Sequence, residues 1–155
     1  MTHPSRRLLF LGAAAAGLAQ GCGAVAQTRD ITVYKTPWCG CCGGWVSHME
    51  KAGFRTKVVV TEDLTPIRTR YKIPFELSSC HTGVIAGYAV EGHVPAEDVE
   101  RLIKERPEAL AILVPGMPIG SPGMEIAGQP NESFDTLLLE KSGKTRVFAR
   151  HTSRG

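Results

Sequence analysis

Three cysteines within four residues, Cys39, Cys41 and Cys42, constrain this chain more than any other feature. They follow a run of β-branched and aromatic residues at 31–34 and precede a run with helical spacing that begins at Cys41. The unpaired N–H groups at the start of a helix carry partial positive charge, which favours the thiolate form of cysteine. Thiolate attacks disulfides and binds soft metals, so the sequence predicts one of these two chemistries at this turn.

The composition is that of a soluble globular protein. The chain has 155 residues, of which 43% are hydrophobic and 21% charged, and this length suits one domain with a real core. The formal net charge of +3 falls to +1 when the two N-terminal arginines, Arg6 and Arg7, are set aside. A charge this small excludes a broad basic surface, and we expect no nucleic-acid partner.

Residues 1–26 are predicted to be an export signal of the twin-arginine type. Arg6 and Arg7 precede an apolar, alanine-rich run at 8–18, and the small-residue motif at 24–26 predicts cleavage after Ala26. The run is too short for a membrane span, and the motifs together argue against a buried N-terminal helix. The mature protein is therefore expected to be periplasmic.

Cys22, which follows Gly21, raises the alternative of a lipid anchor. A leucine is normally found three residues before such a cysteine, and Ala19 stands there instead. We therefore expect a cleaved signal rather than lipidation, and contact with a membrane only if Cys22 is lipidated.

Four cysteines remain after cleavage, and two structural disulfides are the simplest interpretation of four cysteines in an oxidising compartment. The spacing argues against it. Adjacent residues such as Cys41 and Cys42 can bridge each other only with severe strain, and the three clustered thiols have a single distant partner, Cys80. Structural bridges usually join distant loops, whereas this cluster joins almost nothing.

The hydrophobic pattern predicts an α/β protein with a thioredoxin-like fold. Strands are expected at 31–35, 54–60, 83–86 and 88–94, and helices at 41–52, 61–71 and 95–106. A cysteine-rich turn between the first strand and the first helix strengthens this interpretation. In that fold the loop before the third strand packs against the cysteine turn, which would place Cys80 and His81 beside the other thiols.

The remaining residues predict a C-terminal extension of the same domain, which spans 27–155. A strand at 111–114 leads into a Gly/Pro/Met-rich loop at 115–124, and a β-hairpin follows at 134–140 and 145–150. The acidic residues Glu97, Asp98 and Glu100 are expected to be ordinary first-turn charges of a helix.

The spacing of the thiols leaves two chemistries open. Cys39 and Cys42 form a C-x-x-C pair, which suits a thiol–disulfide oxidoreductase. Cys41 complicates exchange because a third thiol can attack the same disulfide, yet it helps a soft metal because clustered thiolates bridge several ions. A single zinc ion normally draws on two separated cysteine pairs, which are absent here. The chemistry favours soft-metal binding, with Cu(I) the metal that such ligands select.

Several other side chains are candidate ligands. His81 adjoins Cys80, and Met117 and Met124 lie in a rigid loop where thioether sulfur can bind Cu(I). His48 is expected to support the site or line the core rather than to ligate.

Three further residues near the predicted site are assigned other roles. His93 is expected to be an ordinary surface or core histidine. Trp38 and Trp45 are expected to shield the site from water and to pack the cysteine turn.

Five blocks of the sequence resemble the CopG family of periplasmic copper-resistance proteins, many of them catalogued only as a domain of unknown function. The blocks are residues 34–42 with Trp45, 79–82, 91–96, 114–118 and 120–124. The resemblance implies a thioredoxin-like fold and a multinuclear copper cluster bridged by four cysteines, which are Cys39, Cys41, Cys42 and Cys80 here. It also implies a role in copper redox chemistry or detoxification.

The leading hypothesis is a periplasmic protein that holds Cu(I) in a multi-cysteine cluster for copper resistance or handling, with copper ions and other envelope copper-handling proteins as partners. Whether it also changes the oxidation state of copper is left open. Two alternatives share the same residues. One is a thiol–disulfide oxidoreductase that uses Cys39 and Cys42, and the other is a copper metallochaperone.

Overall fold

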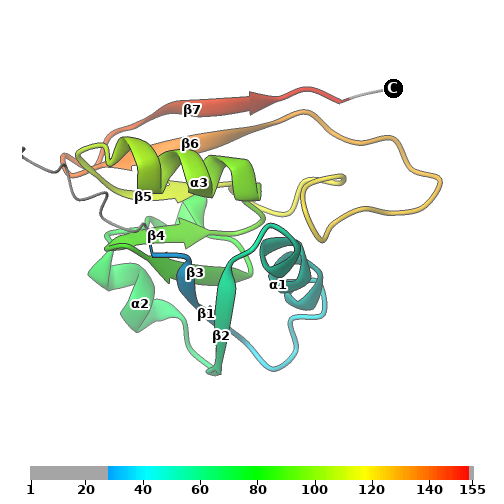
Figure 1. The fold of residues 1–155 in the computed structure, drawn as a ribbon, viewed down its shortest axis with the longest axis horizontal. Coiled ribbons are helices and arrows are strands. Elements are labelled where there is room, and N and C mark those ends of the chain that lie inside the picture. Colours follow the sequence, from blue (N-terminus) through cyan, green and yellow to red (C-terminus); the bar gives the residue numbers. More distant parts are fainter. Residues whose placement is uncertain (1–27, 154–155) are drawn as a thin grey trace, which may run out of the picture.

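The computed structural model describes residues 28–153, which form a mixed α/β structure built on one seven-stranded sheet (Figure 1). The strands run in the order β2-β1-β3-β4-β5-β6-β7. Their bounds are β1 Asp30–Lys35, β2 Arg55–Val60, β3 His81–Ile85, β4 Tyr88–Glu91, β5 Ala109–Leu113, β6 Phe134–Glu140 and β7 Thr145–His151. The helices are α1 Cys42–Lys51, α2 Thr65–Arg70, the 3-10 turn η1 Phe75–Leu77, and α3 Ala96–Glu105.

The order of elements predicted from the sequence is confirmed, including the C-terminal hairpin. β1 pairs parallel with β2 and antiparallel with β3. β3 and β4 form an antiparallel hairpin, and β4 also pairs parallel with β5. Some predicted bounds are wrong. α2 begins at Thr65 rather than 61, because the turn before it is closed by Asp63, whose carboxylate accepts the Thr65 N–H at 2.8 Å. β3 begins at His81, two residues early, and β4 ends at Glu91 rather than 94.

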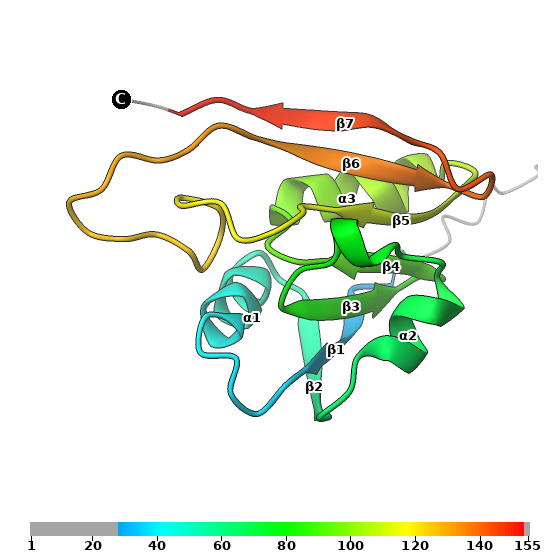
Figure 2. The same ribbon diagram turned by 180° about the vertical axis from the view of Figure 1, so that it is seen from behind.

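The core lies mainly between the sheet and the two longer helices. Trp45 and Met49 of α1, with Val99 and Leu102 of α3, are fully buried in one cluster with side chains from six of the strands and their flanking residues. Tyr71 and Ile73, which follow α2, pack in a second cluster on alternate residues of β4 and β5. Because successive strand residues point to opposite faces, α1 and α3 cover one face and the α2 segment covers the other (Figure 2).

The Gly/Pro/Met-rich loop between β5 and β6 extends beyond the sheet and lies against the start of α1 (Figures 1 and 2). Its contact with the helix is between backbones. A Cβ atom on Gly123, whose φ is +83°, would lie 2.5 Å from the Trp45 nitrogen and 2.9 Å from the Gly44 carbonyl carbon. Only glycine permits both this approach and this backbone conformation. The loop is therefore held directly over the cysteine turn.

No helix within residues 28–153 is long and apolar enough to cross a membrane. The predicted export signal, its cleavage after Ala26 and the alternative of lipidation at Cys22 fall outside the described residues.

Candidate metal centre

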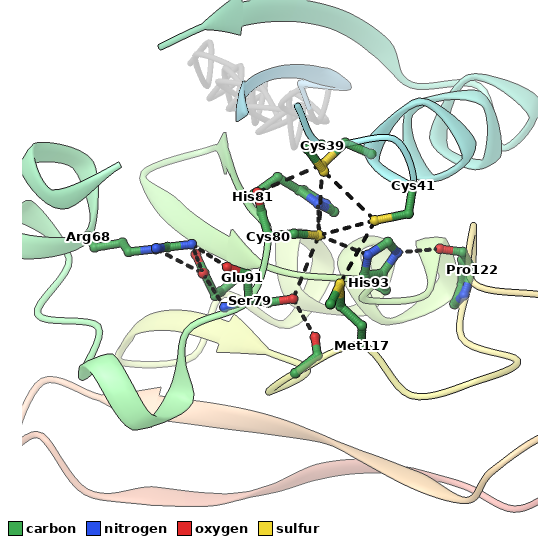
Figure 3. Close-up of a disulfide and its surroundings, with 12 residues drawn as sticks. Cys39, Cys41, Arg68, Ser79, Cys80, His81, Glu91, His93, Met117 and Pro122 are labelled. Atoms are coloured by element: carbon green, nitrogen blue, oxygen red, sulfur yellow. Dashed lines mark hydrogen bonds and ion pairs between the residues drawn. A yellow bond between two sulfur atoms is a disulfide. The ribbon is translucent and has the colours of Figure 1, made fainter. Parts of the chain in front are cut away.

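The four cysteines predicted to form the site come together at the start of α1. The Cys41 sulfur lies 3.8 Å from that of Cys39 and 3.6 Å from that of Cys80, and Cys42 and Cys80 are 3.8 Å apart (Figure 3). All four sulfurs lie within 4.8 Å of one another. Cys80 reaches the turn from the loop between η1 and β3, as the predicted topology requires.

Two of the sulfurs are joined. Cys39 and Cys42 form a disulfide, while Cys41 and Cys80 are free thiols. The expectation that four cysteines would not form two structural bridges agrees with this arrangement, because the one bridge among residues 28–153 joins cysteines three positions apart and ties no distant loop. Cys42 is fully buried, whereas Cys39 is partly exposed. An attacking thiol would therefore reach Cys39 first.

Two histidines lie against Cys80 on the buried side of the cluster. His93 Nε2 is 3.0 Å and His81 Nδ1 is 3.3 Å from the Cys80 sulfur, and both rings are fully buried. The Pro122 carbonyl, 2.8 Å from His93 Nδ1, can only accept a hydrogen bond. His93 therefore carries its proton on Nδ1, and the Nε2 lone pair points at Cys80. A carbonyl that fixes the tautomer in this way is the usual support of a metal-binding histidine.

Burial controls the protonation of these groups. It raises the pKa of the Cys80 thiol to about 12, and the nearby Cys41 sulfur adds to the effect. Burial also lowers the pKa of His93, and it lowers that of His81 to about 3. Cys80 is thus a neutral thiol between two neutral imidazoles near pH 7. A metal ion that binds here would have to displace the thiol proton.

His81 retains an unused polar atom. Its Nε2 is the one buried side-chain nitrogen or oxygen in the described part of the chain that has no hydrogen-bond partner. The ring is held between Trp45, with centroids 4.4 Å apart, and His93, with centroids 5.0 Å apart. Together Cys80, His81 and His93 offer a second group of three ligand atoms that shares the Cys80 sulfur with the four cysteines.

Of the two candidate methionines, the structure brings only Met117 to the thiols. The Met117 sulfur lies 4.0 Å from that of Cys41, and the residue is half exposed at the rim. Met124 has no sulfur contact of this kind within the described residues. Its backbone instead closes turns, donating to Ser121 and accepting from Gly120. An open cavity of about 390 Å³ covers this side of the cluster, lined by residues that include Trp38, Cys39, Cys41, Leu64, Cys80 and Met117.

Trp45, Trp38 and His48 can each be compared with the role expected from the sequence. Trp45 is fully buried and its Nε1 donates to the Val94 carbonyl at 2.8 Å, so it does pack the cysteine turn. Trp38 is 71% exposed and lines the open cavity beside Cys39 and Cys41, so its shielding of the site stays a prediction. His48 Nε2 accepts the Ala96 N–H at 3.0 Å, so it caps α3 instead of ligating.

Sequence reasoning missed His93, and a signal for it was present. The start of β3 and the end of β4 are opposite each other in a hairpin, with Thr82 paired to Glu91. A residue just before β3, such as Cys80, must then lie near one just after β4, such as His93. The predicted hairpin with its turn at Gly87 already implied that Cys80 and His93 lie near each other. The role of His93 was instead inferred only from its neighbours in the sequence.

The fold and the cysteine–histidine cluster place this protein in the class of α/β proteins that carry a thiol-rich candidate site for a soft metal. Comparisons with known proteins extend this. The family model "Protein of unknown function, DUF411" matches residues 77–124, which include Cys80, His81 and His93. No curated protein sequence is matched.

Two solved structures are similar over most of the chain. "Copper resistance protein copG- Form 1" is 39% identical, covers 82% of this chain and 99% of its own, and gives a TM-score of 0.75. "Copper resistance protein copG- Form 2" is 41% identical, covers 79% of this chain and 97% of its own, and gives a TM-score of 0.74. The chain belongs to the CopG family of copper resistance proteins, which confirms the resemblance found in the sequence.

Proposed function

We propose that this protein is an exported, periplasmic protein that holds Cu(I) in a cluster bridged by Cys39, Cys41, Cys42 and Cys80, for copper resistance or handling. The observation that carries the proposal is the convergence of these four sulfurs within 4.8 Å. Soft thiolate ligands at this density select Cu(I) among biological metals. Met117 is the further ligand we favour, because its sulfur lies beside Cys41 at the open rim.

We also infer that β1 to α3 form a thioredoxin-like unit. This is supported by the order β2-β1-β3-β4, with a parallel first pair and an antiparallel hairpin, and by the cysteine turn between β1 and α1. Export is supported by the twin-arginine motif and the cleavage motif of residues 1–26.

The Cys39–Cys42 disulfide favours a second candidate, a thiol–disulfide oxidoreductase. The two functions compete for the same atoms. Opening the disulfide takes two electrons and two protons and yields two thiols, and only then can four thiolates bind copper. Copper loading would therefore require a reductant such as a dithiol, and oxidation of the loaded protein would release part of the ligand set.

Anaerobic titration of the reduced full chain with Cu(I) tests the proposal. We expect several Cu(I) ions per chain, with thiolate-to-copper charge-transfer absorption that grows until the sites are full. Binding of no more than one weakly held ion would contradict it. A Cys22→Ser background keeps the one cysteine outside the described residues from contributing.

The variant Cys41→Ser separates the two candidates. Cys41 is outside the disulfide, so exchange activity should survive or improve in this variant, while a four-thiolate cluster should lose copper. Full copper loading of Cys41→Ser together with strong dithiol-dependent exchange would favour the oxidoreductase.

A further inference from the structure

A fully buried carboxylate lies behind Cys80 and has no part in the copper proposal. Glu91, the last residue of β4, pairs with Arg68 of α2, whose Nη2 and Nε lie 2.8 and 3.0 Å from Oε1. The Thr82 hydroxyl donates to Oε2 at 2.5 Å. Burial raises the pKa of Glu91, and these contacts oppose that effect. A buried charge persists only when it is paired and hydrogen-bonded in this way.

The pair holds Ser79 by both of its backbone polar groups. The Ser79 N–H donates to Glu91 Oε1 at 2.8 Å, and the Ser79 carbonyl accepts from Arg68 Nη2 at 2.6 Å (Figure 3). Ser79 directly precedes Cys80. Since the peptide that enters Cys80 is fixed from two sides, the position of the cysteine is set by side chains that do not contact its sulfur.

The same serine also holds the loop that carries Met117. The Ser79 hydroxyl donates to the Gly116 carbonyl, and the Gly116 N–H donates to the Ser78 carbonyl at 3.5 Å. The space here is tight. A Cβ atom on Gly92, whose φ is +74°, would lie 2.6 Å from both the Ser79 Cβ and the Val114 carbonyl oxygen. One hydrogen-bonded unit therefore fixes the loop of Cys80 and the loop of Met117 relative to each other.

We propose that Arg68 and Glu91 are positioning residues of the copper site, acting through Ser79 to hold the sulfurs of Cys80 and Met117 at binding distance. This inference rests on the proposed function for its purpose. Its geometry concerns how the loops of Cys80 and Met117 are held within the protein, so it can be tested with and without copper. Arg68 is suited to the role because its rigid guanidinium donates to the Glu91 carboxylate from both Nε and Nη2 and to the Ser79 carbonyl from Nη2, whereas the ammonium of a lysine ends a flexible chain and lacks this fixed fork.

The first test needs no copper. The full chain with Cys22→Ser is purified in the disulfide form, so that Cys41 and Cys80 are its free thiols in the described residues. Iodoacetamide labelling is followed by mass spectrometry at each cysteine. We expect Glu91→Gln to raise the labelling rate of Cys80 relative to Cys41 by about tenfold, because the Ser79–Cys80 segment opens locally. Arg68→Lys should give a smaller rise in the same direction.

The matched control is Asp98→Asn. Asp98 is a similarly buried carboxylate, 4% exposed, that accepts hydrogen bonds from Thr136 and His151 and not from the Cys80 loop. Its variant should lower the melting temperature comparably and leave Cys80 labelling at the wild-type rate. Labelling of Cys80 at the wild-type rate in folded Glu91→Gln would overturn the inference. If Glu91→Gln does not fold, Arg68→Lys gives the same decision.

The second test uses Cu(I) competition between the reduced protein and a chelator. Loss of a residue that orients metal ligands typically costs about 10- to 100-fold in metal affinity. We expect a loss of this size and a shifted charge-transfer band in Glu91→Gln, and neither in Asp98→Asn. Equal affinities and spectra in the two variants would count against positioning. If the wild type itself bound no copper, the proposed function would fail, and the labelling rates would still decide whether Arg68 and Glu91 position Cys80.

Discussion

The buried polar side chains around Cys80 and those between α3 and the β6–β7 hairpin differ in how many of their polar atoms have hydrogen-bond partners. In the β6–β7 cluster, the Asp98 carboxylate accepts from Thr136 Oγ1 at 2.6 Å and from His151 Nε2 at 2.8 Å, and the Phe134 ring stacks on His151. The cluster around Cys80 keeps an unpaired His81 nitrogen and faces an open cavity.

This difference in hydrogen bonding indicates a structural role for the β6–β7 cluster and a binding role for the Cys80 cluster. Burial of polar groups costs free energy in both clusters. In the β6–β7 cluster that cost is offset by hydrogen bonds that join α3 to the C-terminal hairpin, and none of its fully buried side-chain nitrogen or oxygen atoms lacks a partner. In the Cys80 cluster sulfur and imidazole atoms remain available, which is what a ligand-binding site requires and a purely structural cluster does not.

Removing the sulfur common to both ligand groups should have the largest effect. Cys80 belongs to the four-cysteine group and to the group with His81 and His93. We therefore expect Cys80→Ser to lose most of its Cu(I) in an anaerobic titration, while Thr136→Val, which alters the β6–β7 cluster, keeps the wild-type amount. Full copper loading of Cys80→Ser would contradict the assignment of a binding role to the Cys80 cluster.

Acid should lower the stability of the folded protein through the buried His81 of the Cys80 cluster. Its pKa is lowered from 6.5 to about 3 in the folded protein, mainly by burial. Below pH 6.5 the unfolded chain takes up a proton that the folded protein excludes, so stability falls as the pH drops from 6.5 toward 3 and is unaffected above that window. The loss by pH 3 should be on the order of 4 kcal/mol.

Denaturant unfolding of the copper-free protein across this window measures the effect. His81→Gln cannot titrate and should show a shallower dependence of stability on pH than the wild type. Leu138→Ala on β6 removes only buried apolar atoms, so it should be less stable with an unchanged dependence. Parallel curves for His81→Gln and the wild type would argue that His81 charges freely in the folded state.

The smallest effects should come from the aromatic residues at the edge of each cluster. Trp38 is 71% exposed, so Trp38→Ala should change the free energy of unfolding by no more than about 0.5 kcal/mol. Phe134 is partly buried against His151, so Phe134→Ala should cost about 1–3 kcal/mol. Thermal or denaturant unfolding compares the two, and a cost for Trp38 as large as for Phe134 would mean that the rim of the cavity is closed in solution.

Features that depend on nearby residues were predictable from the sequence. The order of strands and helices follows from local hydrophobic patterns, and the cysteine turn is visible directly. Cys80 could be placed beside the turn because the order of elements fixes where its loop lies. The hairpin of β6 and β7 was predicted almost to the residue, because strand alternation and the turn at Gly143 are local signals.

Features that depend on strand register or side-chain direction were not predicted. Asp98 was expected to be an ordinary helix charge, yet it is buried, because α3 turns that position toward β6 and β7. Trp38 lies outside any periodic element, so nothing in the sequence tells which way it points. The Arg68–Glu91 pair joins α2 to β4 across 23 residues, and no local pattern links the two.

The sheet ends at β2 on one side and at β7 on the other, and both edge strands carry basic residues and no acidic ones. Arg55 on β2 and Arg146 on β7 are paired with Asp30 and Glu140 of the neighbouring strands, and Lys57 and Arg150 add further positive charge to the two edges. Unpaired edge strands can recruit strands from other molecules and so begin aggregation. Pairing any two of these edges would oppose like charges, which destabilises a sheet. The seven-stranded sheet is thereby discouraged from growing into a neighbouring molecule.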